Sequence, residues 1–313
     1  MRITTAFIIV LILLDSVHAN ALVLRTNDGG ESWIREAPAC TFSLNGVSID
    51  PMSGLAIAVG DRGTVLRRET GSDWEDVSPP GLMKDLRSVA IGIDGVCMAC
   101  GDSGTLISSF DRGVSWRVWG EFDYEGIDFL SVNFDPSSSG SFVITGEDGF
   151  IYTSSARAVE VRTSSSFIGS CVQLCSSFPE MVVSCTGDIY YPLRDSLHTV
   201  SEPLAFNGVT QVVSGGGTCA AVGNEGLVCT YNGADWLVRE SNCTADLYSV
   251  AYITFGRNLC AVGENGTILL SLDNGETWSR VLSGISRNLN GIAGNGSGSG
   301  YIVGESLWGR FLP

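Results

Sequence analysis

Short apolar runs separated by glycine-rich turns fill the chain from residue 20 onward. The runs are four to eight residues long, as in LAIAVG at 55–60 and NLCAVG at 258–263. Runs of this length between turn residues predict β-strands. No stretch after residue 20 keeps its apolar positions at a helical period. We therefore expect an all-β fold.

The runs recur with a period of about forty residues, so internal repeats organise the chain. The tryptophans mark this period, with spacings of 41 and 42 residues in the first group and 42 in the second: Trp33, Trp74 and Trp116, then Trp236 and Trp278. A phrase such as AVGENGTIL (261–269) keeps the same period, and a phrase such as LNGV (44–47) precedes each copy of it. Each unit offers four short strands, which predicts one blade of a β-propeller.

The two ends of the chain carry complementary halves of one unit. The last unit has only its first two strands, at 289–292 and 300–304. The segment ALVLRTNDGGESW (21–33) resembles the third and fourth strands of GTILLSLDNGETW (266–278). Seven units of about 41 residues fit into residues 20–313. We therefore predict a seven-bladed propeller of four-stranded blades, in which the N-terminal strands complete the C-terminal blade and leave no exposed sheet edge.

Residues 1–19 have the pattern of a secretory signal peptide. Arg2 is followed by the apolar run at 7–14 and by the small-residue site VHA at 17–19. The apolar run is too short for a stable transmembrane anchor, although a signal anchor remains the alternative. We expect export through the secretory pathway, to a secreted or lumenal location. In a photosynthetic or bacterial source this would be the thylakoid lumen or the periplasm.

The mature chain is strongly acidic, with a formal net charge of -16 and Lys84 as its single lysine. Binding to a phosphate backbone needs Lys and Arg, so nucleic acid is excluded as a partner. A basic protein surface or a cation fits this charge better.

Ten cysteines in an exported chain favour disulfides. A hairpin folded about Asn224 and Glu225 would place Cys219 opposite Cys229, which makes them a candidate disulfide. Two sequons, Asn242-Cys-Thr and Asn295-Gly-Ser, are candidate glycosylation sites. No metal site or cofactor is expected.

The phrase S-x-D-x-G-x-T-W matches the Asp-box, also called the BNR repeat. Its three complete copies contain Asp28, Gly30 and Trp33; Asp111, Gly113 and Trp116; and Asp273, Gly275 and Trp278. Asp and Gly suit a tight turn, and Trp buries a large ring against the blade. Since turns at symmetry-related outward positions cannot converge on one substrate, we interpret the Asp-boxes as structural.

A second set of residues follows the repeated glycine, in the turn between the second and third strands of each unit. This set consists of Asp61, Asp102, Glu147, Asn224, Glu264 and Glu305. These turns should lie on the face opposite the Asp-boxes and ring one mouth of the central channel. Two interpretations stay open. The acidic side chains cap their own turns, or they form an electronegative rim that binds a basic partner or a cation.

Asp-boxes also occur in sialidases, so a divergent glycan-binding protein or glycoside hydrolase is the alternative function. The Arg-Ile-Pro phrase of sialidases is absent, and no pair of carboxylates stands out by context. His198 has no supporting G-x-S-x-G phrase. The sequence therefore predicts no catalytic residue.

The units of the form VGxxGTIxxSxDxGxTW, best seen at 44–119 and 247–282, resemble the photosystem II assembly and stability factors (Ycf48/HCF136-like BNR-repeat proteins). The resemblance implies a non-enzymatic propeller that binds a membrane-protein subunit. We expect a monomeric protein-binding or assembly module that meets a membrane only through its partner. The twin-Arg signal and the lipobox cysteine are absent, which favours the secretory route. We expect this chain to share the fold of that family, but we do not extend the photosystem partner to it.

Overall fold

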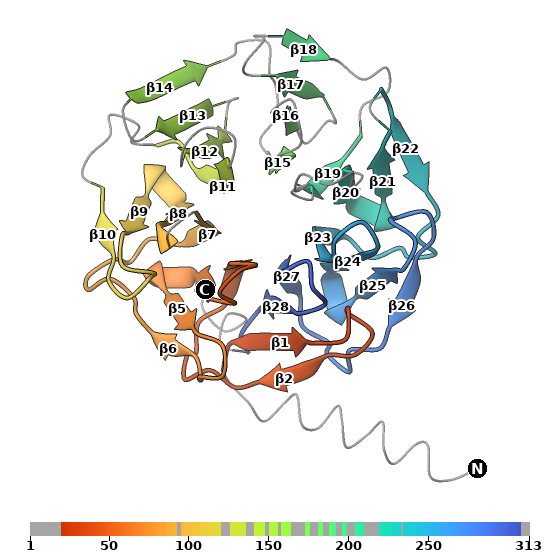
Figure 1. The fold of residues 1–313 in the computed structure, drawn as a ribbon, viewed down its shortest axis with the longest axis horizontal. Helices are drawn as coiled ribbons and strands as arrows, with labels where there is room; N and C mark the ends of the chain where they lie inside the picture. The colour runs from red at the N-terminus through yellow and green to blue at the C-terminus, as the bar shows by residue number, and fades with distance from the viewer. Residues whose placement is uncertain are drawn as a thin grey trace.

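The repeated strands form blades around a central axis (Figure 1) in this computed structural model. It describes residues 20–92, 95–119, 126–135, 141–147, 150–155, 158–163, 173–175, 181–183, 188–191, 196–198, 204–209, 219–232 and 234–307. The predicted signal peptide lies outside these residues. The described strands form seven four-stranded antiparallel sheets, as the repeat predicted.

The blades are numbered 1 to 7 around the ring, and the first-named strand of each blade is its innermost strand. Blade 1 contains β3 (Leu44–Ile49), β4 (Ala56–Gly60), β5 (Val65–Arg68) and β6 (Glu75–Asp76). Blade 2 contains β7 (Leu86–Ile91), β8 (Cys97–Gly101), β9 (Leu106–Ser109) and β10 (Arg117–Val118). Blade 3 contains β11 (Phe129–Asp135), β12 (Ser141–Gly146), β13 (Phe150–Ser155) and β14 (Ala158–Thr163). Blade 4 contains β15 (Gln173–Cys175), β16 (Met181–Val183), β17 (Ile189–Tyr191) and β18 (Ser196–His198).

The remaining blades follow the same order. Blade 5 contains β19 (Phe206–Val209), β20 (Cys219–Gly223), β21 (Val228–Tyr231) and β22 (Trp236–Arg239). Blade 6 contains β23 (Leu247–Thr254), β24 (Asn258–Gly263), β25 (Ile268–Ser271) and β26 (Ser279–Val281). Blade 7 contains β27 (Leu289–Gly294), β28 (Gly300–Gly304), β1 (Leu22–Thr26) and β2 (Ile34–Glu36). In the part of the chain that the structure describes, no helix is long and apolar enough to cross a bilayer.

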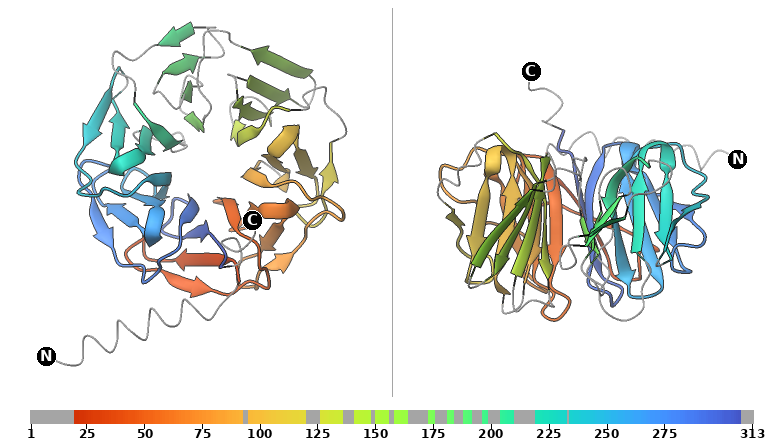
Figure 2. Two further views of the ribbon diagram at one scale, coloured as in Figure 1. Left: turned by 180° about the vertical axis from the view of Figure 1, so that it is seen from behind. Right: turned by 90° about the horizontal axis from the view of Figure 1, so that it is seen from above.

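Blade 7 confirms the predicted closure of the ring. Its strand order is β2-β1-β28-β27, so strands from both ends of the chain share one sheet. β1 pairs antiparallel with β28, with Leu22 opposite Gly304 and Thr26 opposite Gly300. These two strands lie side by side in Figure 1, and the side view in Figure 2 shows the strands running between two opposite faces of the ring.

The hydrophobic core lies between neighbouring blades. In five blades the second strand is buried along its whole length, namely β4, β8, β20, β24 and β28. One cluster joins Val23 and Val303 of blade 7 to Leu44, Ala58 and Leu66 of blade 1. Because the middle strands pack against a blade on each side, their sequences read as continuous apolar runs instead of alternating ones.

The glycine that ends the second strand in six of the seven blades is required by close packing. A Cβ atom on Gly101 would lie 2.0 Å from the carbonyl oxygen of Asp85, and one on Gly263 would lie 2.0 Å from that of Asp246. No real Cβ contact is this short, so only glycine lets the first and second strands meet here.

We expect Gly101→Ala to destabilise the fold by about 3 kcal/mol or more, because the clash is with backbone that cannot rotate away. Gly71→Ala is the matched control. Gly71 has a φ of +86° but open space around the Cβ position, so only the left-handed conformation is strained, at roughly 1–2 kcal/mol. Urea unfolding of both variants measures the difference. A Gly101→Ala variant as stable as Gly71→Ala would show that the close approach does not matter.

Candidate binding face

Two opposite faces of the ring carry different turns. We call the acidic face the end that bears the turns between second and third strands, which contain Asp61, Asp102, Glu147, Asn224 and Glu264. Glu305 lies at the same end, directly after β28, where no turn connects β28 to β1. We call the Asp-box face the opposite end, which bears the turns between third and fourth strands. The antiparallel order of every blade places the two sets of turns at opposite ends, as the sequence predicted.

Four turns on the acidic face share one conformation. Each is a single 3-10 turn: η1 (Asp61–Gly63), η3 (Asp102–Gly104), η6 (Asn224–Gly226) and η7 (Glu264–Gly266). The middle residue of each turn is left-handed, with φ between 53° and 57°. The amide of the first residue donates to the carbonyl that precedes the first strand of its blade, as Asp61 does to Ser43 at 3.0 Å.

A further ring of residues, which the sequence reasoning missed, caps these turns from the next blade. Asp85 Oδ1 accepts the amide hydrogen of Arg62 at 2.8 Å, and Asp128 Oδ1 accepts that of Ser103 at 2.9 Å. In the two remaining turns, Asp246 Oδ1 accepts the amide hydrogen of Glu225 at 2.8 Å and Asn288 Oδ1 accepts that of Asn265 at 3.1 Å. Their position in the sequence could have identified these capping residues, since each of them directly precedes the first strand of a unit.

Side chains from the innermost strands also contact the predicted rim. Asn45 Nδ2 donates to Asp61 Oδ1 at 3.1 Å, and Asn207 Nδ2 donates to Asn224 Oδ1 at 2.7 Å. Each of these asparagines also donates to a main-chain carbonyl of the next blade, Leu86 or Leu247, at 3.0 Å. Glu305 Oε1 accepts from Asn288 Nδ2 at 2.8 Å. The rim residues therefore take part in contacts within and between blades.

Arg87 lies at the centre of the strongest charge cluster on this face. Its Nε lies 2.5 Å from Asp102 Oδ1, and its Nη2 lies 2.7 Å from Asp128 Oδ2. Burial opposes the charge of Arg87, but the hydrogen bond and charge of Asp102 and the charge of Asp128 raise the pKa of its guanidinium. The guanidinium of Arg87 thus forms ion pairs with both carboxylates.

The remaining electrostatics of this face are dominated by negative charge. Burial raises the pKa of Asp61, and the nearby carboxylates of Asp85 and Asp102 add to this effect. Burial and the neighbouring charges of Glu264 and Asp246 raise the pKa of Tyr248 to about 12. The part of both shifts that comes from neighbouring carboxylates shows that a further negative charge is disfavoured here.

The three complete Asp-boxes on the other face have the same hydrogen bonds. In the second copy, Asp111 Oδ1 accepts from Ser109 Oγ at 2.7 Å and from the Ser115 amide at 2.9 Å. Trp116 Nε1 donates to the Gly113 carbonyl at 3.1 Å. The copies built on Asp28 and Asp273 repeat these contacts. The Asp accepts from the amide four residues on, a longer reach than the two or three residues expected from turn chemistry.

We expect Asp111→Ala to cost about 1–2 kcal/mol, because it removes hydrogen bonds to a charged acceptor. Hydrogen bonds from Ser115 and Ser109 lower the pKa of Asp111 to about 2, from an ordinary value of 3.8. The ionised carboxylate therefore stabilises the fold above about pH 4, and this contribution is lost as the pH falls towards 2. Thermal unfolding at pH 7, 4 and 2 should show the gap to wild type closing with acid. The control is Asp73→Ala, at an exposed residue of the incomplete turn in blade 1. A gap at pH 2 as wide as at pH 7 would contradict the assignment.

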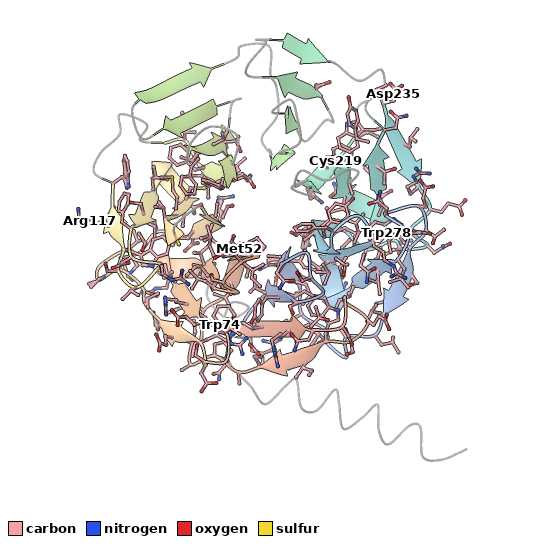
Figure 3. All side chains as sticks on the ribbon, in the orientation of Figure 1. Met52, Trp74, Arg117, Cys219, Asp235 and Trp278 are labelled. Carbon is pink, nitrogen blue, oxygen red and sulfur yellow. The ribbon has the colours of Figure 1, made fainter. Side chains whose placement is uncertain are left out.

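The innermost strands enclose a central cavity of about 690 Å³. Described residues of β3, β7, β11, β19, β23 and β27 line it. Asn45 and Arg87 lie at its acidic-face end, since they contact the rim. Met52 and Phe255 also line it and follow the opposite ends of β3 and β23. Figure 3 places Met52 beside the central opening, and Arg117 and Asp235 at the periphery.

The predicted disulfide between Cys219 and Cys229 is wrong. Cys229 is a free, buried thiol, and burial raises its pKa to about 12. The register of β20 and β21 places Cys229 opposite Ala221, and Cys219 opposite Tyr231. The 3-10 turn centres the hairpin on Glu225 itself instead of between Asn224 and Glu225, so Tyr231 lies opposite Cys219.

The two candidate glycosylation sites lie in connections between strands. Asn242 is exposed in the connection between blades 5 and 6, with a φ of 53°. Asn295 Oδ1 accepts from the amides of Ser297 and Ser299 at 2.9 and 3.1 Å, within the turn between β27 and β28. Glycosylation at either residue stays a prediction. No group of three or more His, Cys, Asp or Glu residues that could hold a metal ion occurs among the described residues.

Comparison with known proteins finds similarity in solved structures. No protein-family model and no curated protein matches the chain. The solved structure of YCF48 from Cyanidioschyzon merolae matches with a TM-score of 0.66 at 17% identity, covering 85% of this chain and 94% of that one. YCF48 bound to D1 peptide matches with a TM-score of 0.68 at 18% identity, covering 86% and 91%. The chain therefore has the Ycf48-like propeller fold that its repeats resemble.

Proposed function

We propose that the mature chain is an exported, non-enzymatic propeller that binds a protein partner through its acidic face. The observation that carries the proposal is the double set of acidic residues on this face. The predicted rim, including Asp61, Asp102 and Glu264, lies beside the capping carboxylates Asp85, Asp128 and Asp246. A basic partner surface complements such a field, which speeds association and selects against acidic partners.

The comparisons support a binding role over an enzymatic one. One of the similar propellers, YCF48, was solved bound to D1 peptide. The rim carboxylates here are engaged by neighbouring amides and cations instead of facing one another as an acid–base pair would. We extend the binding role, and not the identity of the peptide, to this chain.

The test is affinity capture from an extract of the source organism at moderate salt, with the mature chain immobilised. The triple charge reversal Asp61→Lys, Asp102→Lys and Glu264→Lys should lower capture of the partner at least tenfold. The matched control is Glu31→Lys, Asp73→Lys and Asp235→Lys, at exposed positions in the Asp-box turns. It makes the same change in net charge on the opposite face.

Thermal unfolding of both triple variants separates lost binding from lost folding. Equal capture by the wild type and the rim variant would refute the acidic face as the binding surface. Equal loss in both triple variants would show that only net charge matters, and would refute a specific site.

A further inference from the structure

The central cavity is bordered by the free edges of β-strands. The innermost strand of each blade, such as β3, β7 or β23, is the terminal strand of its sheet. Such a strand has one row of main-chain amides and carbonyls without a neighbouring strand. Some of these groups are satisfied across blades, since Ser88 Oγ accepts from the Val132 amide at 3.1 Å and Ser249 Oγ accepts from the Ile292 amide at 3.3 Å. The edges that remain offer hydrogen bonds to an extended chain.

The described residues that line this cavity between its two mouths are uncharged. Among the described lining residues, only Arg87 and Asp50 carry charge, and they stand at opposite ends. Both are engaged, because Arg87 pairs with Asp102 and Asp128, and Asp50 accepts from the amides of Met52 and Ser53 at 3.0 and 3.3 Å. The remaining described lining residues are small, apolar or neutral polar, such as Ser48, Ala90 and Ala293. A charged side chain in the middle would lose its solvation without gaining a partner.

The two mouths differ in chemistry. The mouth on the acidic face is surrounded by the carboxylates described above. The mouth on the Asp-box face presents Met52, which is 93% exposed, and Phe255, which is 44% exposed. Large apolar side chains held in solvent at the entrance of a cavity indicate a surface that is covered when a ligand binds. One end of the channel therefore favours basic side chains of a ligand, and the other end favours apolar side chains.

We propose that the channel holds an extended segment of the protein partner, with basic residues at the acidic face, about six uncharged residues inside and an apolar side chain against Met52 and Phe255. β3 is six residues long, so a strand of about six residues, roughly 20 Å, spans the ring. Charge complementarity fixes the direction of the segment. The proposal rests on the proposed function and adds to it the site and the class of ligand.

Selection of peptides from a random twelve-residue phage-display library on the immobilised mature chain tests the proposal. The expected peptides have Lys or Arg at one end, an uncharged middle and an apolar residue at the other end. Their dissociation constants are then measured by fluorescence anisotropy on two variants. Ser48→Trp places a large ring in the channel, with Ser48→Ala as its control. Met52→Glu places a charge at the apolar mouth, with Val238→Glu, on the outer strand β22, as its control.

We expect Ser48→Trp and Met52→Glu each to weaken binding at least tenfold, and the two controls to change it less than twofold. Met52 is so exposed that its substitution leaves the fold intact, so this arm decides the result even if Ser48→Trp misfolds. Peptides without the pattern, or peptides that bind both variants as tightly as wild type, overturn the channel proposal, and so does failure to select any peptide. If the channel variants bind normally while the rim variant loses partner capture, the channel proposal fails and the proposed function stands.

Discussion

A chain that begins at Ala37, and so lacks β1 and β2, will not form a stable monomeric ring. The deletion removes Leu22, Val23 and Leu24, which are at most 2% exposed. Burial of each such side chain contributes about 1.5–3 kcal/mol, and a domain has only about 5–15 kcal/mol of stability in total. It also uncovers the edge of β28, which becomes a template for pairing with another chain. Size-exclusion chromatography and circular dichroism should show aggregation or a loss of the cooperative thermal transition.

A circular permutant provides the control for this deletion. A short Gly/Ser linker joins Leu307 to Asn20, and the chain is opened between Pro80 and Gly81, in the connection after β6. The join is short, because Arg287 Nη1 donates both to the Asn20 carbonyl at 3.2 Å and to the Glu305 carbonyl at 3.0 Å. The permutant keeps every strand and should fold as a monomer. A truncated chain that melts cooperatively within about 2 °C of the full chain would refute the closing role of β1.

Replacement of Glu36 by Ala should be the most damaging change of a single charged residue that we predict. Glu36, on β2, pairs with Arg25 at 2.9 Å and with Arg68 of blade 1 at 3.4 Å. It also accepts from Trp74 Nε1 at 2.8 Å, and Trp74 packs edge-on against Tyr301 with ring centroids 5.3 Å apart. Loss of Glu36 leaves two largely buried guanidinium groups without this carboxylate. Breaking a buried charge cluster in this way costs about 3–5 kcal/mol, or roughly 10 °C in Tm for a domain of this size.

Glu276→Ala is the matched control for Glu36→Ala. Glu276 lies 2.9 Å from Arg239, but its side chain is 61% exposed. An exposed ion pair contributes only about 0–1 kcal/mol. Differential scanning calorimetry of both variants should therefore show a large fall in Tm for Glu36→Ala and almost none for Glu276→Ala. Equal shifts would mean that the cluster between blades 7 and 1 adds nothing beyond an ordinary surface pair.

The repeat made the architecture predictable from the sequence. Four apolar runs per unit gave the strands of each blade, and the TNDGGESW copy at 26–33 gave the closing blade. The Asp-box turns were also predictable, because their side-chain hydrogen bonds lie within eight residues, from Ser109 to Trp116 in one copy. A repeated sequence pattern therefore predicts the structure inside each unit.

Contacts that cross between units were not predictable in the same way. Asp85, Asp128 and Asp246 cap turns that lie 21 to 25 residues earlier in the chain. The pair Arg68 and Tyr301 spans 233 residues. The capping contacts form only when two neighbouring blades pack together, and the contact of Arg68 with Tyr301 forms only when blade 7 closes against blade 1. The error at Cys229 had a smaller cause, a hairpin centred on Glu225 instead of between Asn224 and Glu225.

The turns on both faces of the ring contact neighbouring blades, but through different groups. The aspartate side chain of an Asp-box bonds inside its own turn, while a carbonyl of the turn accepts from the preceding blade, as Arg112 does from Arg67 Nε at 2.8 Å. Each described 3-10 turn of the acidic face instead has its middle amide capped by a residue from the next blade, as Arg62 is by Asp85. A blade can therefore lengthen or lose its Asp-box without disturbing this chain of caps. The four capped turns of the acidic face thus keep their relative positions when an Asp-box turn changes in length.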